Sequence, residues 1–372
     1  MKHITRLVPA PSFTEYLPLT GSTCPLFLDI ETTGLSAEHN RLYLIGCCCP
    51  REGALEFHQW FAETEDDEAE ILESFLCYTK EFDVLVHFNG DTFDLPFLIR
   101  RAELLHLPCH LSEPRSLDLF REVRKIRTLL SLPNLKQKTL ESYLGIERKD
   151  RMSGGELIHV YQKYLQSPTQ ESEHLLLIHN EEDILDMPKL LPLLIYPQLL
   201  SDDIHVQSLL SLDMEEGETP ALTVDLKTEL NLPAPLHSAS QKGITFLWSG
   251  NRLHLHIPLF CGELRYFFED YKEYYYLPRE DTAIHRSVAE FVDRDYRVRC
   301  KKETAYIRKV SVFLPLPANQ NRKRKSPVSP FRDIRCFTPE FGGPCYLDLQ
   351  DSGPVRDPVF WGIYMHELLL NQ

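Results

Sequence analysis

Long apolar segments are absent from this sequence. A membrane-spanning helix needs roughly 20 consecutive apolar residues, and even residues 190–200 form only a short run that Pro192 and Pro197 interrupt. The first residues, MKHITRLVPAPSF, also lack the apolar segment of a signal peptide. We therefore expect a cytoplasmic protein that has no membrane partner.

Spaced cysteine pairs and glycine-rich phosphate loops are absent as well. Ten cysteines occur without a C-x-x-C pair, which argues against a structural zinc site. Cys47, Cys48 and Cys49 are adjacent in an apolar stretch, so we expect buried free thiols in a reducing compartment. No G-x-G-x-x-G or Walker-type loop is present.

The 372 residues suffice for two domains, but their net charge of −15 is unusual for a protein that binds nucleic acid. This acidity is uneven along the chain. Residues 1–200 carry 19 basic and 31 acidic side chains, whereas residues 241–330 carry 17 basic and 10 acidic ones. A polar stretch at residues 201–220 predicts a boundary between a domain of residues 1–200, with its core at about 24–198, and a second domain of residues 201–372.

The most informative motif is FLDIETTGL, in which an apolar run leads into Asp29 and Glu31. Residues i and i+2 of a strand point to the same face, so these two carboxylates should converge. A hard divalent cation such as Mg²⁺ prefers carboxylate oxygens and would stabilise such a pair. A solvated strand end with alternating acids is the simpler alternative.

Two later segments add acids at strand and helix ends. In VHFNGDTFDLPFL a strand and an NGDT turn precede a helix whose first turn contains Asp94. Asn89 in this turn is also typical of a tight turn. In HLLLIHNEEDILD, His179 and Asp183 are four residues apart and share one face of a helix. A helix cap and a solvated acidic helix are the alternatives for these segments.

The order of the elements predicts an α/β fold for the first domain, because consecutive strands followed by alternating strands and helices fit a mixed sheet with flanking helices. The strands are expected at residues 27–30, 43–49, 55–61, 83–88 and 116–120. The helices are expected at residues 63–80, 93–105, 139–144, 156–165 and 173–187.

DIE, NGDTFD and H-x-x-x-D, in this order, resemble the DEDD superfamily of 3′–5′ exonucleases, which have an RNase H-like fold. The YprB-type ribonuclease H-like branch is the most similar, and NGDTFDLPFL also resembles the second exonuclease motif of proofreading DNA polymerases. By this resemblance Asp29, Glu31, Asp94 and Asp183 are the metal ligands, and His179 occupies the position of the water-activating residue. Two Mg²⁺ or Mn²⁺ ions are implied, with DNA or RNA as the substrate. Asn89 would then orient Asp94 or the substrate by hydrogen bonding, with a purely structural role in the turn as the alternative.

The third motif departs from the family pattern. Members with a histidine usually place it five residues before the last acid, whereas here the spacing is four. Asp186, three residues after Asp183, is the second candidate for the final ligand. Asp118 is a lesser candidate and is expected to be a strand-end acid without metal contact.

The resemblance implies a metal-dependent nuclease that hydrolyses terminal phosphodiesters, most specifically a 3′–5′ exonuclease. An endonuclease on the same fold would share the metal site. A catalytically weak or inactive nuclease-fold module that binds nucleic acid is the alternative, which the acidic charge and the histidine spacing favour.

The second domain is predicted to be α+β, with no recognisable fold. We expect strands at residues 244–250 and 253–259 and a helix at 280–292. The segment YFFEDYKEYYY, residues 266–276, is either a single-strand stacking platform or an internal tyrosine-rich strand. The basic run Arg322, Lys323, Arg324 and Lys325 is a candidate phosphate contact, with a solvated loop as the alternative.

Overall fold

A computed structural model describes residues 1–9, 14–150, 152, 154–201, 203–239, 243–317, 331, 334–351 and 353–371. These residues form two compact units. The first unit contains Met1–Arg127 and Ser131–Gln198, and the second contains Thr128–Leu130 and Leu199–Gln372.

A six-stranded mixed sheet organises the first unit, in the order β1-β4-β3-β2-β5-β6. Neighbours among β1, β4, β3 and β2 pair antiparallel, whereas β5 pairs parallel with both β2 and β6. The expected strands are confirmed, and β1 is an addition that the sequence did not predict. The strands are β1 (Lys2–Pro9), β2 (Leu26–Thr32), β3 (Leu42–Arg51), β4 (Ala54–Phe61), β5 (Val84–His87) and β6 (Arg115–Asp118).

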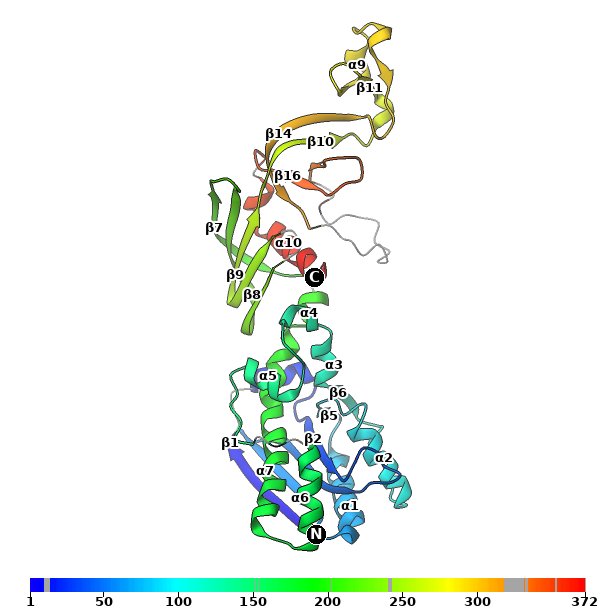
Figure 1. The fold of residues 1–372 in the computed structure, drawn as a ribbon, viewed down its shortest axis with the longest axis vertical. Helices are drawn as coiled ribbons and strands as arrows, with labels where there is room; N and C mark the ends of the chain where they lie inside the picture. Colours follow the sequence, from blue (N-terminus) through cyan, green and yellow to red (C-terminus); the bar gives the residue numbers. More distant parts are fainter. Residues whose placement is uncertain are drawn as a thin grey trace. The chain divides into compact units, whose positions relative to one another are not determined.

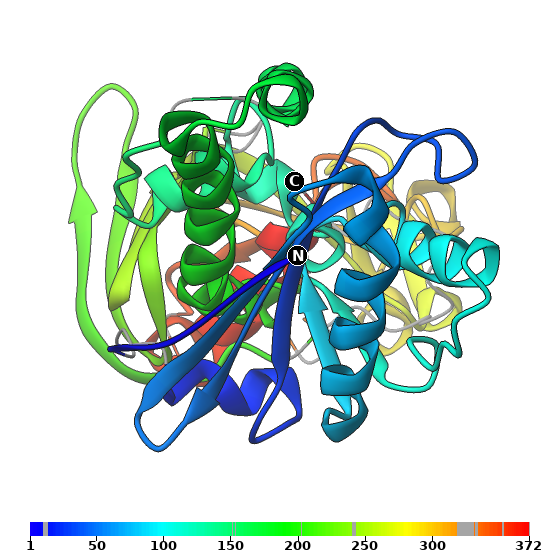
Figure 2. The ribbon, with the colours of Figure 1, turned by 90° about the horizontal axis from the view of Figure 1, so that it is seen from below.

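Helices cover both faces of this sheet (Figures 1 and 2). On β4, Trp60 packs against Phe75 of α1, while its neighbour Gln59 contacts α7 on the opposite face. The helices of this unit are α1 (Glu68–Tyr78), α2 (Asp94–Leu104), α3 (Leu119–Arg124), α5 (Gln137–Tyr143), α6 (Gly154–Gln166) and α7 (Gln170–Asp186). Most residues of α4 (Arg127–Leu130) and α8 (Gln198–Ser201) belong to the second unit. Shorter 3-10 turns are η1 (Thr14–Thr20), η2 (Glu65–Asp67), η3 (Thr79–Glu81) and η4 (Met187–Ile195).

The run LYLIGCCC forms most of the central strand β3 and is apolar at every position instead of at every second one. With helices on both faces, both sets of side chains are removed from water, so every residue from Leu42 to Cys49 is buried. Cys47, Cys48 and Cys49 are buried free thiols, as expected. Burial raises the pKa of the Cys47 and Cys48 thiols, which keeps them protonated.

Three sheets make up most of the second unit, which is rich in strands. One contains β7 (Val206–Glu215), β8 (Ala221–Ala239) and β9 (Thr245–Pro258). The second contains β10 (Phe260–Phe267), β14 (Tyr306–Pro315), β16 (Tyr346–Asp348) and β15 (Cys336–Phe337). The third contains β12 (Thr282–His285), β11 (Tyr274–Leu277) and β13 (Val298–Arg299). The remaining elements are η5 (Tyr271–Glu273), α9 (Arg286–Ala289), η6 (Arg294–Tyr296), η7 (Pro354–Arg356) and α10 (Pro358–Leu370).

Several expectations for this unit are corrected. The two strands expected at residues 244–250 and 253–259 are one continuous strand, β9, which runs through Gly250 at φ +56°. The polar stretch at residues 201–220 contains strand β7, because long antiparallel pairing with β8 stabilises it without clear apolar periodicity.

No helix within the described ranges is long and apolar enough to cross a membrane.

The helix expected at residues 280–292 is wrong. Thr282–His285 is strand β12, and only Arg286–Ala289 is helical. Asp281 adopts a left-handed φ of +49° in the turn that joins β11 to β12, and this conformation prevents a helix from starting there. Pairing with the tyrosine-rich strand β11 therefore overrides the local helical pattern.

Candidate metal centre

The paired acids lie where expected, on the face of β2 that packs against α7. Asp29 is opposite Gly46 and Glu31 is opposite Leu44 in the register with β3. A side chain at position 46 would collide with the Asn180 amide and would place its Cβ 2.8 Å from Ile184 Cγ1. Gly46 therefore permits α7 to approach the sheet closely enough for its polar side chains to reach β2.

Asp94 reaches the same place from the first residue of α2. Its Oδ1 accepts a hydrogen bond from the Ile30 backbone N–H at 3.3 Å, so the carboxylate lies against β2 between the two paired acids. The turn before α2 is fixed by Asn89, at φ +63°, and by Gly90, where a Cβ would lie 2.6 Å from the His87 ring. The local NGD sequence thus sets the direction in which Asp94 enters the site.

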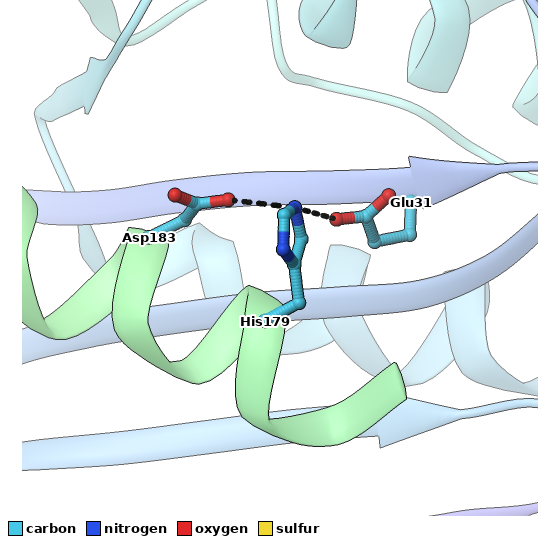
Figure 3. A group of neighbouring side chains, drawn as sticks. All are labelled: Glu31, His179 and Asp183. Carbon is cyan, nitrogen blue, oxygen red and sulfur yellow. Dashed lines mark ion pairs between the residues drawn. The ribbon is translucent and has the colours of Figure 1, made fainter. Parts of the chain in front are cut away.

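Helix α7 contributes His179 and Asp183, which share one face as the four-residue spacing predicted. His179 Nε2 lies 3.3 Å from Asp183 Oδ2 and 3.6 Å from Glu31 Oε1, so the imidazole is placed between the two carboxylates (Figure 3). His179 is buried, with 5% of its surface exposed. Asp183 and His179 are therefore brought together with the acids of β2 by the packing of one helix on one strand.

The acids strongly perturb each other. Burial, followed by the charges of Asp183 and Asp94, raises the pKa of Glu31 to about 8. Burial also raises the pKa of Asp94 to about 7, although hydrogen bonds from backbone N–H groups oppose this. For Asp29, burial and then the charges of Asp94, Asp183 and Glu31 raise the pKa well above its usual range. The negative charges of such a group repel one another, and a hard divalent cation would stabilise the ionised carboxylates.

An amide network that the sequence did not indicate holds Asp29. Asn180 Nδ2 donates to Asp29 Oδ2 at 3.0 Å, and Gln59 Nε2 donates to Asn180 Oδ1 at 3.0 Å. Gln59 Nε2 also lies 2.9 Å from the Leu177 carbonyl oxygen of α7. The network ties β2, β4 and α7 together around one carboxylate. In the sequence, the only signal for this network is that Asn180 directly follows His179.

The segment after α5 supplies a carboxylate that orients His179. Asp150 Oδ2 lies 2.6 Å from His179 Nδ1 and 3.1 Å from Lys138 Nζ. Burial opposes ionisation of Asp150, but hydrogen bonds from the Met152 backbone, His179 and Lys138 outweigh it and lower its pKa. An ionised Asp150 favours the proton on Nδ1, which leaves Nε2 to face Glu31 and Asp183.

Arg148 is a second contribution of this segment. Its Nη1 donates to Asp183 Oδ1 at 2.6 Å and to Glu141 Oε1 at 3.1 Å. The side chain is 7% exposed, and its Nε and Nη2 atoms form no hydrogen bond among the described residues. This contact places a positive charge beside Asp183 at the edge of the acid group. Nothing in the local sequence distinguishes this arginine from its basic neighbours.

The other sequence candidates occupy different places. Asp186 pairs with Lys189 and lies outside this group. Asp118 caps α3 by accepting from the Arg121 backbone N–H at 3.3 Å, although its charge also raises the pKa of Asp94. Asn89 is exposed, and its Oδ1 accepts from Thr92 Oγ1 at 3.2 Å within the turn. The basic run Arg322, Lys323, Arg324 and Lys325 lies outside the described residues.

A second group of potential ligands contains His87, Asp91 and Asp118. Both ring nitrogens of His87 already have partners, because Nε2 lies 2.7 Å from Ser116 Oγ and Nδ1 accepts from the Gly90 N–H at 3.1 Å. Burial lowers the pKa of His87, so the ring is neutral. This group closes the turn between β5 and α2 and offers no free ligand nitrogen.

Comparison with known proteins supports the fold. Residues 26–195 match the family model described as the RNase_H superfamily. No curated protein matches the chain. The mixed sheet with flanking helices is the RNase H-like fold, as predicted.

Similar solved structures include a family B DNA polymerase from the hyperthermophilic archaeon Pyrobaculum calidifontis, at 15% identity and a TM-score of 0.36. That match covers 70% of this chain and 37% of the polymerase, so the chain spans little more than a third of its length. Another is described as the apo form of a nuclease, at 16% identity and a TM-score of 0.32, covering 51% of this chain and 79% of that one.

Proposed function

We propose that this protein is a divalent-metal-dependent nuclease, and specifically a 3′–5′ exonuclease acting on DNA or RNA. The observation that carries the proposal is the convergence of Asp29, Glu31, Asp94 and Asp183, because burial and the negative charges of this group raise the pKa values of Asp29, Glu31 and Asp94. The match of residues 26–195 to the RNase_H superfamily supports the nuclease part of this proposal. The YprB-type branch remains the more specific prediction.

The four carboxylates would hold two Mg²⁺ or Mn²⁺ ions. Bound there, the ions would lower the pKa of the attacking water and neutralise charge on the phosphate. The protein's own contribution is to fix the ligands before substrate arrives. Asn180 holds one oxygen of Asp29, and the Ile30 N–H holds one oxygen of Asp94. In each of these two carboxylates, a hydrogen bond to one oxygen fixes the orientation of the group and leaves the other oxygen for a metal ion.

His179 is proposed to accept the proton of the attacking water at Nε2. Asp150 holds the ring by Nδ1, in the arrangement that carboxylates commonly use to orient a basic histidine. Lys138 keeps Asp150 ionised from the other side. With the four-residue spacing, Nε2 lies beside Glu31 and Asp183, two of the proposed metal ligands.

The direct test is incubation with single- and double-stranded DNA and RNA, labelled at the 5′ or the 3′ end, with Mn²⁺ or with a chelator. An exonuclease acting from the 3′ end releases labelled mononucleotide from 3′-labelled substrate and a descending ladder from 5′-labelled substrate. Cleavage of a circular substrate would instead indicate an endonuclease. Absence of Mn²⁺-dependent hydrolysis on all four substrates would exclude the proposed activity.

One observation favours an inactive nuclease-fold module that binds nucleic acid as the second candidate. Arg148 already pairs with Asp183 at 2.6 Å, and an arginine in this position supplies charge that a metal ion would otherwise supply. Titration calorimetry with Mn²⁺ separates the candidates. The nuclease must bind Mn²⁺ in competition with Arg148, whereas the inactive module binds none.

The raised pKa values predict an unusual pH dependence of stability without metal. In the folded protein Glu31 and Asp94 keep their protons to about pH 8 and about pH 7, against ordinary values of 4.5 and 3.8. Between these limits the unfolded chain binds fewer protons, so the free energy of unfolding falls as pH rises. For Glu31 the loss is at most roughly 5 kcal/mol, since one pKa unit corresponds to about 1.4 kcal/mol.

Urea unfolding with a chelator should therefore show lower stability at pH 8 than at pH 6.5, and added Mn²⁺ should restore it at pH 8. Glu31→Gln is the matched control and should flatten the dependence. Burial lowers the pKa values of His3 and His87, so these two histidines make the free energy of unfolding rise with pH below about pH 6.5. The difference between parent and Glu31→Gln cancels this contribution, because both proteins contain the two histidines. Equal pH dependence in parent and variant would contradict the prediction.

Asp150→Asn tests the orientation of His179. The variant keeps its shape but loses the charge that holds the proton on Nδ1, so kcat should fall about 10- to 100-fold, as for other residues that orient a functional histidine. KM for a short oligonucleotide should change little. Asp225→Asn is a matched control in the second unit, because Asp225 Oδ1 lies 2.9 Å from His254 Nδ1. A kcat within twofold of the parent would remove Asp150 from this role.

A further inference from the structure

A small lobe of the second unit, residues 268–305, is inserted between strands β10 and β14. Its sheet β12-β11-β13 packs on a core of Ala283, Cys300 and Ala305. Tyr274 and Tyr276 pack against this core. The end of the segment 266–276 is therefore an internal tyrosine-rich strand, one of the two alternatives that the sequence left open. Figure 1 shows β11 and α9 of this lobe in yellow.

Tyr275 lies between these two tyrosines and therefore points to the other face of β11. Its partner across the antiparallel pair is Arg299, which consequently shares that face. The guanidinium groups of Arg297 and Arg299 lie 5.1 and 5.4 Å from the centre of the Tyr275 ring. One face of the sheet thus holds a tyrosine covered by two arginines, and the opposite face holds the core.

The same arrangement continues beyond the end of the strand. Arg279 is two residues past Leu277, the last residue of β11, and its guanidinium lies 4.5 Å from the centre of the Tyr296 ring. Tyr296 is 46% exposed. Lys301 follows Arg299 by two residues, beyond the buried Cys300. We call Tyr275, Arg279, Tyr296, Arg297, Arg299 and Lys301 the arginine–tyrosine face.

Three cations of this face differ from others in the lobe by having no acidic partner. Within the part of the chain that the structure describes, Arg279, Arg299 and Lys301 form no ion pair with an acidic side chain. Arg286, elsewhere in the lobe, pairs with Glu273 at 2.7 Å. Between residues 294 and 302 the chain carries five basic side chains and one acid. Residues 294–302 are therefore locally basic, although the protein has a net charge of −15.

We propose that the arginine–tyrosine face binds single-stranded nucleic acid. This inference rests on the proposed nuclease function and adds the surface that holds the strand outside the acidic first unit. Guanidinium and ammonium groups neutralise successive phosphates, while exposed rings and guanidinium planes accept stacked bases. A duplex hides its bases from such stacking, so the face selects the single strand. An acidic protein could pair with these cations, but it has no bases to stack on the exposed rings.

The first experiment measures fluorescence anisotropy of a labelled oligo-dT and a labelled oligo-U of about 20 nucleotides, with a chelator present to prevent turnover. The variant Arg279→Ala/Arg299→Ala/Lys301→Ala should bind at least about tenfold more weakly at about 0.1 M salt. The slope of log affinity against log salt should fall by about 2, because each phosphate contact to a single strand contributes about 0.7. Arg286→Ala, whose cation is already paired, should bind within twofold of the parent.

Tyr296→Leu tests stacking separately from charge. It should weaken binding about tenfold and leave the salt slope unchanged, because stacking of a base on a ring releases no counterions. A duplex of the same length should bind the parent more weakly and should not distinguish Tyr296→Leu from the parent. Circular dichroism and thermal unfolding of each variant establish that the lobe remains folded.

Hydrolysis of thymidine 5′-(p-nitrophenyl phosphate) with Mn²⁺ keeps this inference apart from the proposed nuclease function. This substrate is too small to reach beyond a metal centre, so the triple variant should hydrolyse it at the parent's rate. If the parent binds oligonucleotides but hydrolyses nothing, the nuclease proposal fails and the binding face stands. If the triple variant binds with the parent's affinity and salt slope, or the parent binds no single strand, the binding face is overturned.

Discussion

Asp29→Ala is expected to abolish nuclease activity, lowering kcat by roughly 10³-fold or more, because residues that act as one unit in catalysis fail together when one is removed. Asp29 is the acid on which the charges of all three others act. Without it the remaining carboxylates lose a shared ligand for the metal ions, and Mn²⁺ binding measured by calorimetry should be lost in parallel. Removal of a repelled, buried carboxylate should leave the metal-free protein at least as stable as the parent.

The control for Asp29→Ala is Asp225→Ala, which removes an acid from the second unit. Its activity and Mn²⁺ binding should match those of the parent. Urea unfolding of both variants with a chelator shows whether each is folded before its activity is compared. A folded Asp29→Ala protein that retains full activity would exclude this site.

Asp183→Asn is expected to be far more damaging than Asp186→Asn, by about 100-fold or more in kcat. Asp183 contacts His179 at 3.3 Å and Arg148 at 2.6 Å, whereas Asp186 pairs with Lys189 away from the other acids. The amide keeps the shape of the side chain but cannot supply the negative charge that a metal ion requires. Activity on end-labelled oligonucleotides with Mn²⁺ measures both variants on the same scale.

Loss of charge at Asp183 has a second consequence. The amide oxygen of Asp183→Asn can still accept from Arg148, but the variant removes a negative charge beside this buried guanidinium and leaves Glu141 as its hydrogen-bonded anionic partner. Asp183→Asn should therefore also destabilise the protein, by up to roughly 3 kcal/mol, the scale of a broken buried ion pair. Activity must therefore be expressed per folded molecule. If Asp186→Asn is the more damaging variant under this correction, the final acid of the third motif is Asp186.

The sequence predicted the first unit well because its signals are local. An apolar run buried on both sides identifies β3, and the NGD turn followed by a helical pattern identifies α2. Asp29, Glu31, Asp94, His179 and Asp183 each follow a signal of this kind. The same reasoning failed at residues 280–292, where a helical pattern is overridden by pairing with β11.

What the sequence determined by itself is most strands and helices of the first unit, with β1 and α3 as exceptions, and the acids placed on them. Strand alternation and helical spacing fix which of these side chains share a face. Tertiary structure decided the rest. The contacts of Asn180 with Asp29, of Asp150 with His179 and of Arg148 with Asp183 join residues 29 to 151 positions apart. No local pattern encodes such contacts, because they depend on how closely α7 and the segment after α5 pack on the sheet.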